Sequence, residues 1–179
     1  MKRVFFSLVA LLLLPLMGAV AQNQLRTDIA IAYLWDKVGK FTNVRETPGG
    51  KVKVQIPIAD YNIVFALVDC KNGWWKILEC GDAEGNEEAD PICSKATGGY
   101  IHYSCIALDT RNYDGQTISL RSEPYDKGEV LWSTKQSIMV RPIDVSADGD
   151  WLKVKTIDGK HQGWISRDWL CSNPLTNCC

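Results

Sequence analysis

The sequence has few histidines, no excess of basic charge and no long apolar run beyond its first residues. With 20 Lys and Arg against 21 Asp and Glu, the formal net charge is −1, which excludes the basic face that a nucleic-acid-binding domain needs. No apolar segment after residue 21 is long enough to span a bilayer. No stretch sustains the 3.6-residue apolar period of a helix, so we expect no helix.

Motifs of the common enzyme classes are also missing. The sequence has no Gly-x-Ser-x-Gly elbow, no His-Glu-x-x-His zinc motif, no phosphate-binding glycine-rich loop and no Cys-x-x-Cys pair. A cysteine hydrolase needs a thiolate beside a histidine, and only two histidines are present: His102, close to Cys105, and His161 in a predicted turn. We keep a hydrolase built on Cys105 as the third of three hypotheses. We expect no enzyme, no cofactor and no metal site.

The first 21 residues are predicted to be a signal peptide. Lys2 and Arg3 give a basic start, residues 4–20 are almost wholly apolar, and Ala19-Val-Ala21 is an A-x-A exit. Cleavage after Ala21 would leave 158 of the 179 residues. This signal predicts a protein of the periplasm or of the space outside the cell.

One pattern is present twice. Three blocks recur in the same order: Gly39–Pro48 as Gly115–Pro124, Trp74–Ile77 as Trp151–Val154, and Gly99–Ile101 as Gly163–Ile165. Matched blocks in one order predict two copies of one small domain, over residues 22–106 and 107–179. Each copy is near the lower size at which a domain buries enough core to be stable alone.

Each copy shows short strand patterns separated by Gly and Asn turns. The predicted strands cover 29–35, 52–56, 63–68, 74–78 and 100–101 in the first copy, and 129–132, 137–140, 151–155 and 163–165 in the second. Runs of β-branched and aromatic residues bounded by turns such as Asn72-Gly73 are typical of small all-β barrels.

The alternation of side chains along a strand assigns the tryptophans to faces. Trp75 and Leu152 share a face with apolar residues and are predicted to be core. Trp74 and Trp151 share a face with lysines and are predicted to be partly exposed. We assign Trp164 to the core as a residue that fills a thin barrel.

The repeated motifs resemble the SH3 fold in its exported bacterial form. A Gly turn, Trp-x-Lys-hydrophobic, a second turn and Gly-aromatic-Ile follow one another in both copies. Asn43-Val-Arg45 with Pro48, and Ser119-Leu-Arg121 with Pro124, are similar to the opening motif of bacterial SH3-like domains. The resemblance implies two tandem SH3-like barrels.

By position, the resemblance also implies a ligand groove. Trp74 would line it in the first copy, and Trp151 and Trp169 would line it in the second. Tyr33 and Trp35 lie in the segment that leads into the long loop of the first copy. The first hypothesis is therefore a non-catalytic exported module that binds peptide or peptidoglycan through aromatic grooves.

Two exchanges separate the copies. The proline that follows Gly-aromatic-Ile in proline-binding relatives is His102 in one copy and Ser166 in the other, and Cys105 stands at the position of Trp169. We expect that the copies do not bind alike.

The first copy carries 13 extra residues between Leu78 and Thr97. Cys80 and Cys93 bracket an acidic segment, residues 81–92, and we expect a disulfide between them across the base of a hairpin. The second hypothesis is an interaction or inhibitor protein that contacts another secreted protein through this hairpin. The acidic side chains of the hairpin offer oxygen ligands of the kind that calcium takes. Their spacing does not match the known calcium loop, so we expect the tip of the hairpin to be solvated.

Export would deliver the seven cysteines to an oxidising compartment. Cys171 can reach Cys178 or Cys179, and Cys70 and Cys105 remain as a third pair. Spacing does not determine connectivity, and an odd count leaves one thiol free or paired with another chain. The oligomeric state stays open.

Overall fold

A computed structural model describes residues 28–58, 62–112 and 114–171 of the chain. The predicted signal peptide, residues 1–21, lies outside the described residues. Within the described part, no helix has the length and apolar character needed to cross a membrane.

The described residues are predominantly β-strand, as predicted. The strands are β1 (Ala30–Leu34), β2 (Phe41–Arg45), β3 (Val52–Pro57), β4 (Ile63–Lys71), β5 (Trp74–Asp82), β6 (Tyr100–His102), β7 (Ile106–Asp109), β8 (Ile118–Arg121), β9 (Val130–Thr134), β10 (Met139–Val145), β11 (Trp151–Thr156) and β12 (Gln162–Ser166). The helices are η1 (Glu87–Ala89), α1 (Asp90–Ala96), η2 (Tyr103–Cys105) and η3 (Arg167–Trp169), where η marks a 3-10 helix.

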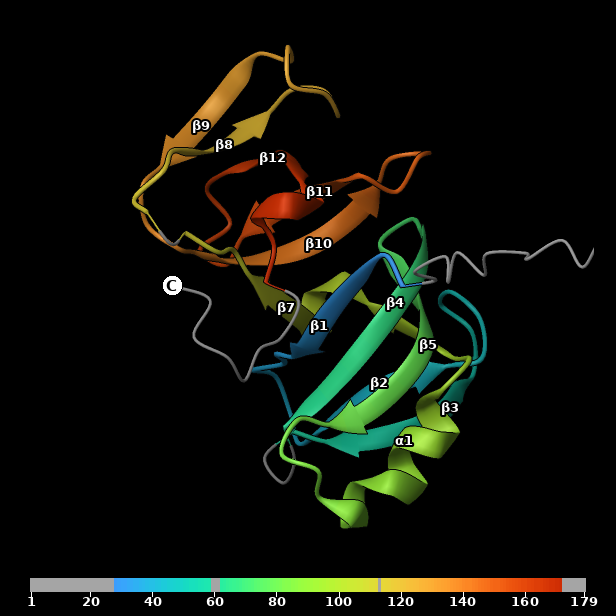
Figure 1. The fold of residues 1–179 in the computed structure, drawn as a ribbon. Coiled ribbons are helices and arrows are strands. Elements are labelled where there is room, and N and C mark those ends of the chain that lie inside the picture. The colour runs from blue at the N-terminus through green and yellow to red at the C-terminus, as the bar shows by residue number, and fades with distance from the viewer. Residues whose placement is uncertain (1–27, 59–61, 113, 172–179) are drawn as a thin grey trace, which may run out of the picture.

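The sequence repeat has a counterpart in strand order. The hydrogen-bonded order is β3-β2-β6-β5-β4-β1-β7-β10-β11-β12-β8-β9. Outward from its centre, the first half (β1 to β6, with α1) runs β1, β4, β5, β6, β2, β3, and the second half (β7 to β12) runs β7, β10, β11, β12, β8, β9. Each strand therefore has an equivalent in the other half, and Figure 1 shows the two halves one above the other.

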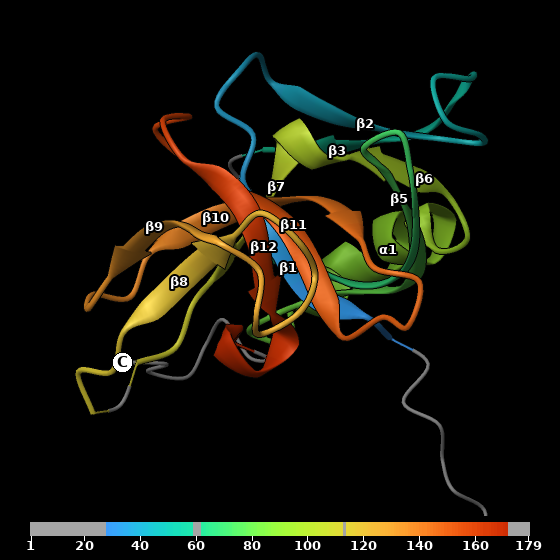
Figure 2. The same cartoon turned by 90° about the horizontal axis from the view of Figure 1, so that it is seen from above.

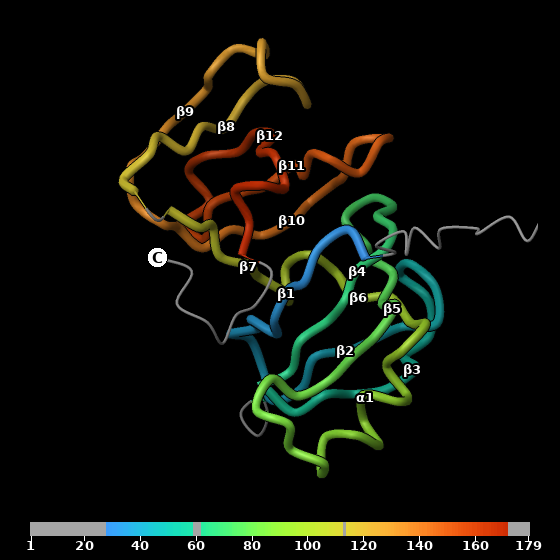
Figure 3. The backbone as a smooth tube through the Cα atoms, in the orientation of Figure 1, coloured from blue at the N-terminus to red at the C-terminus, as the bar shows by residue number. Residues whose placement is uncertain are grey.

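β7 joins the halves. Ile106 and Ala107 pair with β1, whereas Leu108 and Asp109 pair with β10. Figure 3 shows the chain crossing from one half to the other through this strand. The expected boundary between residues 106 and 107 falls inside β7, and the buried apolar side chains of both halves form one contiguous cluster.

The face assignments are confirmed at four positions and wrong at one. Trp75 and Leu152 are fully buried, and Trp74 and Trp151 are partly exposed. Trp164 is predicted to be core but is partly exposed, because the next side chain on β12, Ile165, is buried and alternation turns the Trp164 ring to the other face.

The expectation of a helix-free chain with a hairpin at the insertion is also wrong. β5 ends at Asp82, and η1 and α1 follow. The Asn86 side chain accepts the backbone N–H of Glu88 and caps η1, while a proline lies in the first turn of α1, where its missing N–H is tolerated. Seven residues are too few to show an apolar period, and such a short helix is stabilised by tertiary packing. Its buried side chains are Cys93 and Ala96, and Ala89 of η1, directly before it, is also buried.

The disulfide assignments are confirmed in part. Cys80 and Cys93 form the predicted bond, which links β5 to α1. Cys171 is also disulfide-bonded, and its expected partners, Cys178 and Cys179, lie outside the described residues.

The expected Cys70–Cys105 bond is wrong, because both thiols are free. The fold gives them different surroundings. The Cys70 thiol lies 3.5 Å from the Ile143 carbonyl oxygen, and the Cys105 thiol lies 3.8 Å from Ser104 Oγ. Sequence spacing carries no information about these neighbours.

A β-bulge on β10 turns the backbone of the second half toward the first. The register shifts between Pro142 and Asp144, which leaves Ile143 without a partner on β11. The carbonyl of Pro142 accepts a hydrogen bond of 2.7 Å from the buried Trp75 Nε1. The carbonyl of Ile143 accepts from the Cys70 thiol.

Arg141 adds a second contact between the halves. Its Nη1 lies within hydrogen-bonding distance of four carbonyl oxygens of the first half and the β7 segment, those of Trp35, Tyr103, Ser104 and Ile106. Three of these carbonyls belong to η2 or to the residue that follows it, so the guanidinium ties this helix to the second half.

Replacing Trp75 with phenylalanine should lower the free energy of unfolding by about 1–3 kcal/mol, because the Pro142 carbonyl would be buried without its donor. Urea denaturation followed by far-ultraviolet circular dichroism measures this. Trp74→Phe is the matched control on the same strand and should change stability by no more than about 0.5 kcal/mol. Equal losses in the two variants would contradict a special role for the Trp75 indole.

Candidate functional site

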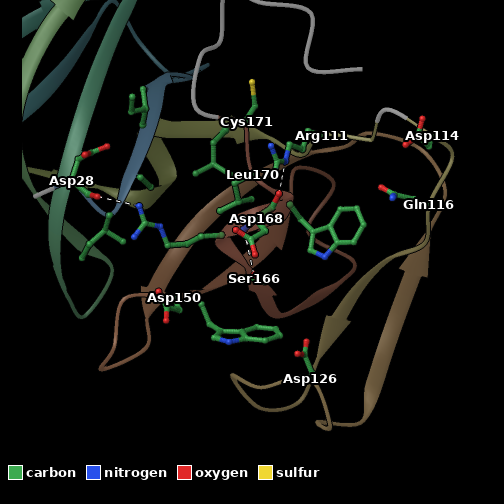
Figure 4. Close-up of a pocket in the computed structure, with 17 residues that line it drawn as sticks. Asp28, Arg111, Asp114, Gln116, Asp126, Asp150, Ser166, Asp168, Leu170 and Cys171 are labelled. Atoms are coloured by element: carbon green, nitrogen blue, oxygen red, sulfur yellow. Dashed lines mark hydrogen bonds between the residues drawn. The ribbon is translucent and has the colours of Figure 1, made fainter. Parts of the chain in front are cut away.

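A pocket of about 970 Å³ opens in the second half at its contact with β1 (Figure 4). Its walls come from the start of β1, the segment after β7, the start of β11, and η3 with the residues that follow it. Trp151 is the first residue of β11, and Trp169 is the last residue of η3. Both line the pocket, so the structure brings together the two groove residues predicted for the second copy.

A tight turn positions Trp151. Gly149 has a φ of 78°, a left-handed conformation that favours glycine. Ser146 Oγ accepts the backbone N–H of Trp151 at 3.0 Å and donates to Asp148 Oδ1 at 2.5 Å. The hydrogen bond from Ser146 lowers the pKa of Asp148 below its usual value, so the carboxylate stays charged and holds the turn.

Polar contacts fix η3 and with it Trp169. Ser166 Oγ accepts a backbone N–H of the first turn of η3 at 3.3 Å. The Arg167 guanidinium donates to the carbonyl of Gly149 at 3.4 Å and to the carbonyl of Asp28 at 3.1 Å. Arg167 therefore ties η3 to the turn that precedes Trp151 and to the first half of the molecule.

The pocket carries an excess of negative charge. Five aspartates line it against two arginines: Asp28, Asp114, Asp126, Asp150 and Asp168 against Arg111 and Arg167. Figure 4 shows Asp114, Asp126 and Asp150 on separate segments around the opening. Both arginines donate to backbone carbonyls: Arg111 Nε to that of Asp168, and Arg167 to those of Gly149 and Asp28. Carboxylates around two indole rings favour a positively charged ligand.

The first half covers its equivalent tryptophan. His102 stands at the position of Ser166, and its ring lies 5.0 Å from the ring of Trp74 between centroids. Tyr103 packs on His102 in turn, at 4.4 Å. Trp74 lines neither the large pocket nor the second one, because side chains of its own half lie against the indole.

Tyr33 and Trp35 line a second pocket of about 320 Å³. Their rings meet edge to face with centroids 6.1 Å apart, and Lys37 Nζ lies 3.6 Å from the Trp35 ring centre. Tyr33 donates a hydrogen bond of 3.1 Å to Asp109 Oδ2, and burial followed by the Asp109 charge raises the pKa of Tyr33. Four of the five predicted groove residues thus fall in two separate pockets, and the fifth, Trp74, lines neither.

Cys105 does not contact a histidine directly. His102 Nδ1 lies 2.7 Å from Ser104 Oγ, which lies 3.8 Å from the Cys105 thiol. Burial raises the pKa of Cys105 to about 11, so the thiol stays protonated at neutral pH, whereas a nucleophilic cysteine is a thiolate. This geometry gives no support to the cysteine hydrolase hypothesis.

The acidic segment uses its first carboxylate, that of Asp82, within the fold. Asp82 accepts the backbone N–H groups of Asn62, Glu84 and Asn86. Across residues 28–58, 62–112 and 114–171, no three His, Cys, Asp or Glu side chains group as a metal site.

Sequence reasoning missed the aspartates of the pocket and Arg167. Asp114, Asp126 and Asp150 come from three separate turns, so no local spacing connects them. Only for Asp150 did the sequence hold a signal, because this residue directly precedes Trp151.

Comparisons with known proteins do not assign a family. No family model matches the chain, and no curated protein matches it. Among solved structures it is similar to NlpC1 from Trichomonas vaginalis, at 14% identity and a TM-score of 0.30 over 79% of this chain and 45% of that one. It is also similar to NlpC2 from the same organism, at 12% identity and a TM-score of 0.30 over 79% and 47%. The chain spans less than half the length of these proteins.

Cys70 and Cys105 should react slowly with iodoacetamide at pH 7 in the folded protein, because burial raises their pKa values to about 12 and about 11. Denaturation without reductant should make both react fully, while Cys80 and Cys93 stay unmodified until reduced. Peptide mapping by mass spectrometry measures all four. Fast modification of native Cys105 would contradict this expectation and revive the hydrolase hypothesis.

Stability should depend on pH through His102. Burial lowers its pKa, so the unfolded chain binds the proton more tightly than the folded protein does. The free energy of unfolding should therefore fall as pH drops through the ordinary histidine value of about 6.5. His102→Asn should reduce this loss between pH 7 and pH 5, measured by urea denaturation. Identical pH profiles for wild type and variant would disprove the assignment.

Proposed function

We propose that this chain is an exported, non-catalytic binding protein made of two SH3-like barrels, and that it holds a peptide or peptidoglycan-type ligand in the pocket of its second half. The observation that carries the proposal is the meeting of Trp151 and Trp169 in one pocket. They are the two groove positions that the SH3 resemblance implies for this half, and they come from β11 and η3.

The repeated strand order supports the tandem architecture. The same six-strand order occurs in both halves, and the repeated sequence blocks fall on equivalent strands. Each half of such a duplicated pair can diverge while the other keeps a function.

The pocket has the size and surface of a peptide site. Its volume of about 970 Å³ lies at the upper end of typical ligand pockets, about 300–1,000 Å³. Indole faces offer flat apolar area to peptide planes and aliphatic side chains. The surrounding aspartates favour a ligand that carries a free amine, which both a basic peptide and the peptide part of a cell wall can supply.

Export is supported by two independent features. The first 21 residues have the pattern of a signal peptide. The Cys80–Cys93 bond is of the kind that persists in oxidising compartments.

In this proposal the halves have different roles. The first half supplies one wall of the pocket through Asp28 and β1, and its own Trp74 is covered by His102. The second half supplies the aromatic contacts.

Trp151→Ala and Trp169→Ala should each weaken ligand binding by about tenfold or more, because an aromatic contact in a desolvated pocket contributes about 1.4 kcal/mol or more. Retention of the mature protein on purified cell-wall sacculi, and its titration with a soluble wall peptide, measure this. Trp74→Ala is the matched control at the equivalent position and should bind like wild type.

Circular dichroism should show that all three variants keep their fold. No retention of the wild-type protein and no binding of the wall peptide would refute the proposed function. An equal loss in all three variants would refute the assignment of the ligand to the second half.

A further inference from the structure

The two halves differ in what covers two equivalent strands, β3 and β9. In the first half, α1 contacts β3. Lys53, on β3, donates through Nζ to the Thr97 carbonyl at 2.6 Å, just after the end of the helix. Figures 1 and 2 show α1 at one end of the molecule and the β8–β9 hairpin at the other.

The second half has no helix at the equivalent place. Its connection from β11 to β12 is a short turn, because the insertion is present in the first half alone. Registers align the strands: Arg45 pairs with Val52 as Arg121 pairs with Val130. Leu131 thus stands where the first half has Lys53.

Apolar side chains are exposed on this uncovered strand. Val130 is 48% exposed and Leu131 is 53% exposed. A β-bulge leaves Leu131 without a partner on β8. Trp132, the next residue, is held by stacking on His161, with ring centroids 4.6 Å apart and planes 16° apart.

β9 is also the last strand of the sheet. Within the described part of the chain it pairs with β8 alone, and no other described strand pairs with its outer backbone edge. Proteins commonly protect such edges with a lysine or a covering helix, and the first half has both. An apolar edge strand without these protections accepts a further strand.

We propose that β9 pairs antiparallel with β9 of a second copy of this chain, about a two-fold axis at Trp132. This register sets Glu129 opposite the Lys135 position of the other copy, and Val130 opposite the Thr134 position. Glu129 and Lys135 are exposed and of opposite charge, so the strand is complementary to itself, as a two-fold contact requires.

This charge symmetry selects a second copy over an unrelated strand. Glu129 and Lys135 lie three residues on either side of Trp132, so each meets the other's position when the strand is turned end to end. The dimer contact is separate from the aromatic pair Trp151 and Trp169, so it does not depend on the proposed function.

Analytical ultracentrifugation of the mature full chain over a wide concentration range tests the proposal. The wild-type protein should form a dimer. Leu131→Lys, which installs the residue found at the equivalent position of the first half, should shift it to monomer. Val52→Lys on β3 is the matched control, since Val52 is 44% exposed, and it should leave the dimer intact.

A charge exchange makes the test specific for the register. Glu129→Lys and Lys135→Glu should each weaken dimerisation by about fivefold, because each puts like charges opposite one another twice in the dimer. The double variant restores opposite charges and should recover the wild-type affinity. Circular dichroism checks that each variant is folded.

Three results would overturn the proposal. They are a wild-type protein that stays monomeric at every concentration, a dimer that Leu131→Lys does not weaken, and a double charge variant that fails to recover. Binding of ligand by the monomeric Leu131→Lys protein is measured separately, so the result for the dimer does not decide the function of the pocket.

Discussion

The hydrogen bond from the buried Trp75 indole to the Pro142 carbonyl is the contact on which the relation between the two halves depends. It joins Trp75, in the core of the first half, to the β-bulge on β10 of the second half. A buried carbonyl without a donor is unfavourable, so the bulge and the indole stabilise each other's position. Arg141 and β7 act at the same joint, and the result is one shared core instead of two separate ones.

This joint also shapes the pocket. The start of β1 forms one wall of it, and Arg167 reaches from η3 to the backbone of Asp28. Trp151 and Trp169 therefore occupy a cavity that the second half does not form alone. Arg167 takes part both in holding the halves together and in holding the aromatic pair, because it ties η3 to the turn before Trp151 and to the backbone of the first half.

Small exchanges make the duplicated halves unequal. An imidazole at position 102 has the size and flatness to pack on Trp74, whereas the hydroxyl of Ser166 is too small to cover Trp151 and instead caps η3. An inserted helix covers β3, whereas a short turn leaves β9 bare. The first half is covered at both places, and the second half is open at both.

The sequence by itself determined the repeat, nine of the twelve strands (all but β2, β7 and β8), and the sides of β5 and β11 that face inward. Alternation is local, and it correctly assigned Trp75 and Leu152 to the core and Trp74 and Trp151 to the surface. Proximity across the acidic segment was enough to predict the Cys80–Cys93 bond. These features depend on neighbours within a few residues or on one short loop.

Tertiary structure alone decided which residues from distant segments meet. It made α1 stable through burial against β3 and β5, although seven residues show no helical period. It separated Cys70 from Cys105, and it placed aspartates from three turns around Trp151 and Trp169. The physical reason is that packing, charge and burial in a folded chain depend on three-dimensional neighbours, and spacing along the sequence does not specify them.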